Sequence, residues 1–199
     1  MSLPIILASA SKSRANLMRA AGITFDIVPA HADEDSVKAS LKAEGATAAQ
    51  CAETLAELKA VQISQRHHEA LVIGADQMLD CDGIWFDKPK DMDGARSHLL
   101  LLRGKTHVLP TAVCVALNGS RIWHHVAQPR LTVRDFSDAF IETYLEAAGT
   151  AVLSSVGAYQ LEGPGAQLFT RIDGDFFTIL GLQLLELLGF LREHGAVTR

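Results

Sequence analysis

The stretch LVIGADQMLDCDGIWFDKPK, residues 71–90, decides how the chain folds. It opens with the apolar run Leu71–Ile73, which predicts a buried strand that stops at Gly74. Asp76 then lies at the carboxyl end of this strand. Ligands of open α/β sheets bind near strand carboxyl ends. We therefore expect Asp76 to belong to a ligand site.

A tight turn follows this strand. Asp82-Gly83, between two apolar segments, is typical of a two-residue β-hairpin. The register that follows from this turn places Leu79 opposite Phe86 and Gln77 opposite Lys88. The hairpin is therefore expected to return Lys88 to the neighbourhood of the first strand.

Lys88 is one residue away from the position that would face Asp76, because side chains alternate along a strand. Pro89 cannot donate a hydrogen bond to a ladder, so the pairing should end near it and let Lys88 turn toward Asp76. An acid, an amide and an ammonium at one strand end indicate a polar active site. A surface hairpin with ordinary solvated charges is the alternative.

Length and composition indicate an ordinary globular protein of one large domain or two small lobes. The chain has 199 residues, of which 48% are hydrophobic and 21% charged, and its net charge is −5. This charge argues against a protein that coats nucleic acid. The three cysteines form no C-x-x-C pair, and an odd number fits no disulfide framework, so reduced thiols of a cytosolic protein are expected. No signal peptide or membrane span is predicted.

The segment LASASKSR, residues 7–14, predicts an anion site. Ser9 or Ser11 can cap a helix that ends at Gly22, and a strand that leads into a helix N-terminus presents free N–H groups to an anion. Lys12 and Arg14 add cationic donors there. Serine caps without any ligand are the common alternative.

Two further groups of charged residues are candidates for the site. The consecutive acids Asp33–Asp35 can help to hold a hard cation, or they are only solvated. Thr47 begins a long helix with an apolar stripe of Cys51, Leu55 and Leu58. Lys59 lies at the edge of this stripe, where its ammonium reaches into a cleft or is an ordinary boundary lysine.

The remaining chain alternates helices, strands and hairpin turns. Tyr159 and Glu162, in a glycine-rich loop at 155–165, are candidates for stacking on a base and hydrogen-bonding it; a turn with one buried aromatic is the alternative. The predicted elements are strands at 4–8, 25–29, 106–117, 121–133 and 166–172, and helices from Asp91 to Gly104, from Phe136, and at 177–194. This order predicts an α/β protein with a mixed sheet.

Taken in order, several segments resemble the Maf family of nucleoside triphosphate pyrophosphatases. The resemblance covers nearly the whole chain and rests on LASASKSR, ADED (32–35), LKA (58–60), IGADQ, FDKPK, GKTH (104–107) and GAYQLEG. It implies a single Maf-like domain over 1–199, a two-lobed α/β fold with an elongated mixed β-sheet flanked by helices, and a central cleft similar to that of inosine triphosphate pyrophosphatases. The implied reaction is metal-dependent hydrolysis of a nucleoside triphosphate to a monophosphate and pyrophosphate.

The resemblance also implies roles for individual residues. Asp76 matches the aspartate that accepts a proton from water, and Glu34 together with Asp76 matches the site of a divalent cation, Mg²⁺ or Mn²⁺. Lys59, Lys88 and Arg14 match cations that face the phosphates, with Ser9 and Ser11 in the same phosphate-binding region. Phosphoryl transfer depends mainly on positioning and electrostatic stabilisation, which explains this set of residues.

Departures from the family pattern bear on the base. Lys12-Ser13-Arg14 stands where the family usually has Pro-Arg-Arg, and the replaced first arginine is typical of the branch that resembles dTTP and UTP hydrolases. That branch also has a threonine at the position of Gln77 and a glutamine at the position of Glu162. The Gln77 and Glu162 of this chain instead match the branch that resembles 7-methyl-GTP pyrophosphatases. A carboxylate can accept from N1–H and the amine of guanine. That branch often has tryptophan at Ser13, and Gln183 replaces a proline.

The resulting interpretation is an enzyme that removes a modified guanine nucleotide such as 7-methyl-GTP, as house-cleaning of non-standard nucleotides. A dTTP/UTP pyrophosphatase and a non-enzymatic nucleotide-binding regulator of cell division are the alternatives. Asp76, Lys59 and Lys88 together favour an enzyme over a binder. The protein is expected in the cytoplasm. Its expected partner is a nucleoside triphosphate substrate, with no nucleic-acid polymer and no membrane. A homodimer is expected because the family tends to form dimers.

Overall fold

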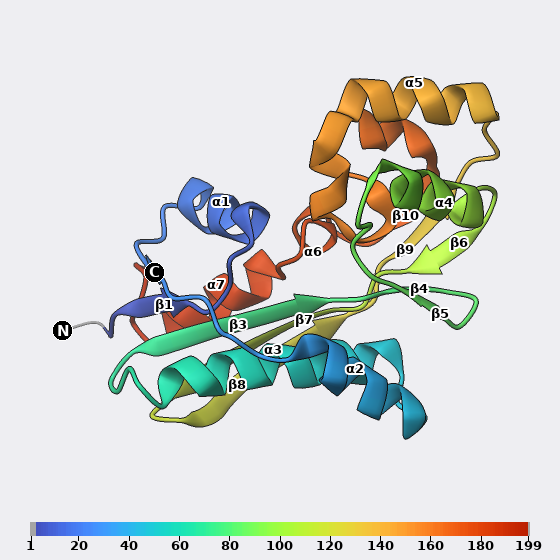
Figure 1. Ribbon diagram of the computed structural model, residues 1–199. Coiled ribbons are helices and arrows are strands. Elements are labelled where there is room, and N and C mark those ends of the chain that lie inside the picture. Colours follow the sequence, from blue (N-terminus) through green and yellow to red (C-terminus); the bar gives the residue numbers. More distant parts are fainter. Residues whose placement is uncertain (1–2, 199) are drawn as a thin grey trace. The chain divides into compact units, whose positions relative to one another are not determined.

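The computed structural model describes residues 3–198, which form two compact units. Unit 1 takes in the chain up to Gln77, Thr111–Ala127 and the segment from Phe176 onward, and unit 2 takes in Met78–Pro110 and Gln128–Asp175. Each unit contains one five-stranded sheet. The predicted mixed α/β fold is therefore confirmed, with the strands divided between two sheets (Figure 1).

Unit 1 is built on a mixed sheet in the order β2-β1-β3-β7-β8. Strand β1 runs parallel to β2 and β3, while β7 runs antiparallel to β3 and β8. Its strands are β1 (Ile5–Leu7), β2 (Asp26–Ile27), β3 (Leu71–Gln77), β7 (Thr111–Leu117) and β8 (Ser120–Ala127). Its helices are α1 (Lys12–Ala20), α2 (Glu34–Ala43), α3 (Ala48–Ser64), α6 (Phe176–Ile179) and α7 (Leu184–Glu193).

Alternation along β3 divides the core of unit 1 between two faces of the sheet. Leu71, Ile73 and Ala75 pack with residues of α1 and α7, whereas Val72 packs with Ile63 of α3. Figure 1 shows α3 along one face of this sheet and α1 and α7 on the other. Asp76 continues the series of Val72 and Gly74, so its side chain belongs to the α3 face.

Gly74 lets α3 approach β3 closely. A Cβ atom at this position would lie 2.2 Å from the carbonyl oxygen of Ala56 and 2.7 Å from the amide nitrogen of Ala60. Strand glycines often mark such close backbone approaches. The contact stripe of α3 is therefore made of alanines as well as Cys51 and Leu55, and Leu58, which was expected in it, is 36% exposed.

Unit 2 contains an antiparallel sheet in the order β10-β9-β6-β4-β5, accompanied by α4 and α5. Its strands are β4 (Leu79–Cys81), β5 (Ile84–Phe86), β6 (Thr106–Val108), β9 (Arg130–Val133) and β10 (Phe169–Asp173). Its helices are α4 (Met92–Leu102) and α5 (Asp138–Ala148), followed by 3₁₀ turns η1 (Gly149–Ser154), η2 (Val156–Ala158) and η3 (Pro164–Leu168).

Both predicted hairpin turns are confirmed. Cys81 pairs with Ile84 around Asp82-Gly83, and Leu117 pairs with Ser120 around Asn118-Gly119. All four turn residues have positive φ values between 50° and 81°, as a type I′ turn requires. The pairing of β4 with β5 ends at Leu79 and Phe86, so the predicted opposition of Gln77 and Lys88 was wrong; Gln77 pairs with Thr111 instead.

Several predicted elements are divided or extended. The strand predicted to stop at Gly74 is β3, which runs to Gln77. The two long strands predicted at 106–117 and 121–133 each break at a proline, Pro110 and Pro129, which cannot donate to a ladder. The helix predicted at 177–194 is two helices with a turn at Gly181, whose φ is 103°.

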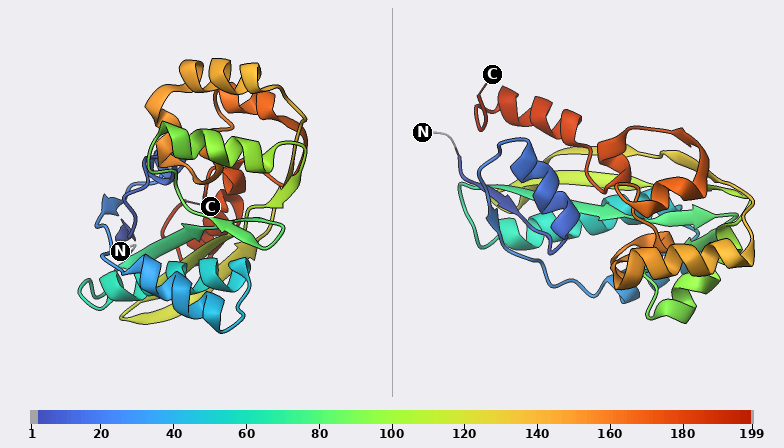
Figure 2. Two further views of the ribbon diagram at one scale, coloured as in Figure 1. Left: turned by 45° about the vertical axis from the view of Figure 1, so that its right-hand side comes forward. Right: turned by 90° about the horizontal axis from the view of Figure 1, so that it is seen from above.

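Helix α2 was missed because its apolar content is low and none of its residues is buried. Asp33 caps it by accepting a hydrogen bond from the Ser36 amide at 3.1 Å. Figure 2 shows α2 beside the first turns of α3. Among residues 3–198, no helix has the length and apolar character needed to cross a membrane.

Candidate functional site

Three charged side chains of unit 1 meet at the α3 face of its sheet. The ammonium of Lys59 lies 2.6 Å from Oδ1 of Asp76 and 2.7 Å from Oε1 of Glu34. Lys59 and Asp76 are buried, at 8% and 6% exposure, while the Glu34 side chain is 41% exposed. One ammonium therefore bridges two carboxylates at the edge of a buried region, and we call this arrangement the lysine bridge.

Each member of the lysine bridge is positioned by its own element. Asp76 follows Gly74 on the α3 face of β3, and Lys59 follows Cys51 and Leu55 at four-residue spacing on the buried stripe of α3. Glu34 is the first residue of α2. Lys59 is thus not an ordinary boundary lysine, and the three consecutive acids have different roles, since Asp33 caps α2 and Asp35 is exposed.

Arg14 lies close to this cluster but is held by the protein itself. Its Nε donates to the carbonyl of Gly181 at 2.8 Å, and its Nη1 donates to the carbonyl of Ala75 at 2.8 Å and to Oγ of Ser9 at 3.2 Å. Burial lowers the pKa of Arg14, and the charges of Asp76 and Glu34 oppose this effect. The guanidinium is therefore a fixed positive charge beside the carboxylates.

The serines of the predicted anion site surround the start of α1. Ser11 is the N-cap, accepting from the amide of Arg14 at 3.4 Å, and Ser9 accepts from the amide of Ser11 at 3.2 Å. Ser13 lies half-buried in the first turn and Lys12 is exposed. The sequence left the capping serine open, and the structure assigns this role to Ser11.

Gln77 points to the opposite side of the sheet from Asp76. Its amide nitrogen donates to Oγ1 of Thr111 at 2.9 Å and to the carbonyls of Thr178 and Ile179 at 3.1 and 3.2 Å. Gln77 therefore holds the segment around α6 against the end of β3. A direct contact between Gln77 and a base stays a prediction.

Two predicted site residues, Lys88 and Glu162, belong to unit 2. Lys88 is exposed after β5, and Glu162 is exposed in the turn before η3. Their approach to Asp76 stays a prediction. Tyr159, by contrast, is buried: its hydroxyl lies 2.8 Å from Nε2 of His107, and its ring packs edge-on against Phe169. The buried-aromatic alternative was correct for Tyr159.

The lysine bridge contains side chains of the kind that bind a divalent cation. Asp76 and Glu34 supply hard carboxylate oxygens, the donors preferred by Mg²⁺ and Mn²⁺. Among residues 3–198 there is no group of three or more His, Cys, Asp or Glu arranged for a metal. Two carboxylates are nevertheless enough for Mg²⁺, which commonly completes its shell with waters and substrate phosphates.

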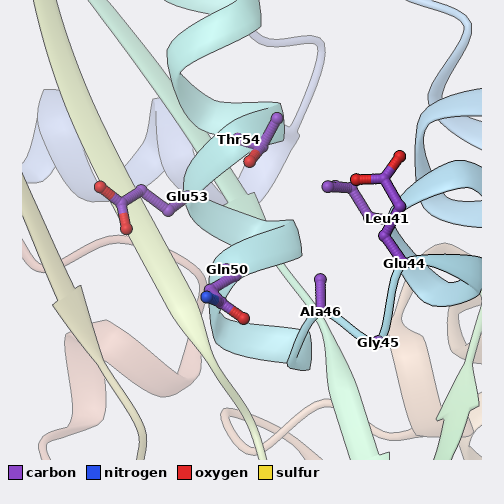
Figure 3. A pocket seen from close by; sticks show the side chains of 7 residues that line it. All are labelled: Leu41, Glu44, Gly45, Ala46, Gln50, Glu53 and Thr54. Carbon is purple, nitrogen blue, oxygen red and sulfur yellow. The ribbon is translucent and has the colours of Figure 1, made fainter.

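A shallow hollow of about 430 Å³ lies elsewhere in unit 1, between the end of α2 and the first turns of α3. Figure 3 shows Glu44 and Glu53 on separate sides of it. Both carboxylates are paired: Glu44 accepts from Ser40 at 3.0 Å, and Glu53 accepts from Arg121 of β8 at 3.1 Å. The hollow contains none of the predicted site residues, so the lysine bridge is the candidate site.

Sequence reasoning missed the residues that fasten the segment 178–183. The buried amide of Gln183 donates to the carbonyl of Thr111, and its Oε1 has no hydrogen-bond partner among the described residues. Arg14 and Gln77 hold the same segment from the other end. The only signal was the glutamine in place of the family's proline, which does not reveal a partner 72 residues away.

His107 makes unit 2 sensitive to acid. It is fully buried, and burial lowers its pKa to about 4. Because the unfolded chain takes up the proton near pH 6.5 and the folded chain does not, stability falls as the pH drops from about 6.5 toward 4. At pH 5 we expect His107 to cost about 2 kcal/mol relative to pH 7.

Urea unfolding of the wild type and of His107→Gln at pH 7 and pH 5 measures this cost. The loss of stability between the two pH values should be smaller in the variant by that amount. Equal losses in both proteins would show that His107 is protonated as easily in the fold as in the unfolded chain.

Comparison with known proteins decides the family. The sequence profile described as "Maf-like protein" matches residues 4–194, which includes nearly the whole chain. The chain belongs to the Maf-like protein family. The resemblance inferred from the ordered motifs is therefore confirmed, and this Maf-like match runs through both units without a break.

Curated relatives of this Maf-like chain agree with the profile over nearly their full lengths. A protein of Paramagnetospirillum magneticum named nucleoside triphosphate pyrophosphatase is 58% identical, covering 96% of this chain and 98% of the relative. One of Granulibacter bethesdensis with the same name is 54% identical, covering 98% and 100%. A Brucella abortus protein named 7-methyl-GTP pyrophosphatase is 46% identical, covering 99% of each chain.

Proposed function

We propose that this enzyme hydrolyses 7-methyl-GTP or a similarly modified guanine nucleotide at the α–β phosphate bond. The chain is a nucleoside triphosphate pyrophosphatase, as its Maf-like family and its relatives at 52–58% identity indicate. The observation that carries the proposed site is the meeting of Asp76, Glu34 and Lys59, because it joins two carboxylates and a cationic side chain.

We assign the chemistry to side chains of unit 1. Asp76 accepts the proton of the attacking water, which a carboxylate near a bound cation can do. Lys59 and Arg14 stabilise the negative charge that develops on the phosphate oxygens. Ser9 and Ser11, at the start of α1, together with the amides of its first turn, orient the phosphate tail. Lys88 of unit 2 is proposed to add a third cation.

Asp76 and Glu34 would hold a divalent cation, Mg²⁺ or Mn²⁺. When bound, this cation supplies positive charge against the phosphate oxygens. Without a bound metal cation the cluster of Asp76, Glu34, Lys59 and Arg14 carries no net charge, because its two carboxylates balance its two positively charged side chains. A dication would make the cluster positive and so favour a triphosphate.

The proposed base specificity rests on Glu162 and on the relatives. A carboxylate at Glu162 can accept from two guanine donors, whereas thymine and uracil lack an amine. Relatives at 46–47% identity carry the name 7-methyl-GTP pyrophosphatase. Ser13 stands where an arginine would suit a pyrimidine carbonyl, and Gln77 acts on specificity through the segment it holds around Thr178.

The proposal includes the setting of the enzyme. We propose that the two units form one Maf-like domain over 1–199, which acts as a homodimer in the cytoplasm. Its partner is then the nucleotide substrate, with neither a nucleic-acid polymer nor a membrane. Removal of non-standard nucleotides is the cellular role that agrees with this substrate.

Relative kcat/KM values test the specificity. We expect 7-methyl-GTP to be hydrolysed at least about tenfold more efficiently than dTTP or UTP, because a site built to hydrogen-bond the guanine donors discriminates against a base that lacks the amine. Glu162→Gln should lower kcat/KM for the guanine nucleotide, since an amide donates where a carboxylate only accepts.

Glu146→Gln, an exposed change on α5 in the same unit, is the matched control and should leave the ratio unchanged. A wild-type preference for dTTP or UTP would support the pyrimidine alternative and contradict the proposed specificity. Nucleotide binding without turnover of any triphosphate would instead support the non-enzymatic regulator.

A further inference from the structure

The lysine bridge places an ammonium between the two carboxylates that would hold a cation. Nζ of Lys59 lies 2.6 Å from Asp76 and 2.7 Å from Glu34, whereas Mg²⁺ binds carboxylate oxygens at about 2.1 Å. The ammonium and a cation cannot both lie between the same two oxygens. One of them must leave before the other occupies the position between Oδ1 of Asp76 and Oε1 of Glu34.

We propose that Lys59 is a built-in competitor of the metal: its ammonium closes the cation site in the nucleotide-free protein and opens it by moving to the phosphates. This inference rests on the proposed function, because it concerns the same cation site. It assigns Lys59 a second role, which is to keep the site closed to cations until a triphosphate draws the ammonium away.

Lys59 is the cation of this cluster that can move. Arg14 is fixed by three acceptors, the carbonyls of Gly181 and Ala75 and the hydroxyl of Ser9. The Lys59 ammonium is held by Asp76 and Glu34 at the end of a flexible four-carbon stem. A rotation of that stem changes the partner of the ammonium without moving α3.

Charge balance explains why cation and nucleotide would then bind together. While Lys59 neutralises the carboxylates, an added dication meets a site without net negative charge. A triphosphate offers the ammonium new anionic partners and so releases both carboxylates for the cation. Each ligand thereby raises the affinity for the other, which is a coupling of the reciprocal kind.

Direct Mn²⁺ titration by calorimetry, without nucleotide, tests this role. Lys59→Met leaves Asp76 and Glu34 without their shared ammonium, so we expect Mn²⁺ to bind at least about tenfold more tightly than to the wild type. Adding Glu34→Gln to this variant should remove the gain. Lys105→Met breaks the lysine–aspartate pair with Asp82 in unit 2 and should leave Mn²⁺ affinity unchanged.

A measurement on the wild type keeps the proposal testable if Lys59→Met does not fold. Buried, paired lysine ammonium groups give ¹H–¹⁵N signals, and the Lys59 signal can be assigned through its own side-chain carbons. Saturation with Mg²⁺ should shift or broaden this signal as the ammonium leaves the carboxylates. The carboxyl ¹³C shifts of Asp76 and Glu34 report cation binding independently.

The proposal is overturned if Lys59→Met binds Mn²⁺ no more tightly than the wild type, or if Mg²⁺ shifts the carboxyl signals while the Lys59 signal stays unchanged. These outcomes are distinct from failure of the proposed function. An active wild type with no gain in Lys59→Met refutes the competition alone. Competition in a protein that releases no pyrophosphate refutes the function alone.

Discussion

Replacing Asp76 by asparagine is expected to lower the turnover number at least about a hundredfold, the lower end of a general-base effect. The amide keeps the shape of the side chain but cannot accept the proton of water, and it carries no charge for a cation. Lys59 still has Glu34 as a partner, so the fold should persist. Initial rates of pyrophosphate release under saturating Mg²⁺ and nucleotide measure the effect.

Asp35→Asn is the matched control for this change. Asp35 is an exposed carboxylate next to Glu34 in the first turn of α2, and its replacement should leave the turnover number within about twofold. An Asp76→Asn protein as active as this control would place the base elsewhere. Glu34 would then be the next candidate.

Replacing Gly74 by alanine is expected to lower stability by about 3 kcal/mol, because the added methyl group overpacks a filled contact. The new Cβ would lie 2.2 Å from the carbonyl oxygen of Ala56, so backbone rather than a flexible side chain must move. Helix α3 also carries Lys59, and activity should fall together with stability. In a chain of this length the melting temperature should fall by roughly 10 °C.

Gly189→Ala provides the control, since a Cβ there meets no atom within 4 Å. This glycine lies within α7, where alanine is favoured over glycine by about 0.5–1 kcal/mol. Circular dichroism melting curves of the two variants should therefore shift in opposite directions. If Gly74→Ala melts at the wild-type temperature, α3 does not depend on the close approach at this glycine.

The elements that could be predicted are those with strong local signals. Asp82-Gly83 and Asn118-Gly119 predict hairpins because few residue pairs adopt positive φ at both turn positions. Thr47 predicts the start of α3 because its hydroxyl and Gln50 satisfy each other's free backbone N–H groups. In these places local chemistry alone decides the conformation.

The errors lie where distant residues decide the structure. The apolar run Leu71–Ile73 predicts a strand that stops at Gly74, yet β3 continues through this glycine, whose missing side chain lets α3 pack closely there. The helical spacing of Cys51, Leu55 and Leu58 predicts Leu58 on the buried stripe of α3, but Leu58 is 36% exposed. Close packing against the sheet selects the alanines instead.

Contacts between distant residues also limit what the sequence predicts about the site. Asp76 and Lys59 were identified separately, and their contact depends on how α3 crosses β3, which no local pattern specifies. The segment ADED predicts a cluster of acids, but the sequence does not show that Asp33 caps α2 and that Glu34 pairs with Lys59. The amide of Gln77 donates to the carbonyls of Thr178 and Ile179, which the sequence did not predict, and its contact with a base stays a prediction.

The products of the first turnover test the central claim most directly. Phosphorus NMR of 7-methyl-GTP mixed with the enzyme and Mg²⁺ should show the nucleoside monophosphate and pyrophosphate appearing together in equal amounts. The signals of a nucleoside diphosphate and orthophosphate should be absent at early times. Appearance of the diphosphate and orthophosphate as first products would contradict hydrolysis at the α–β bond.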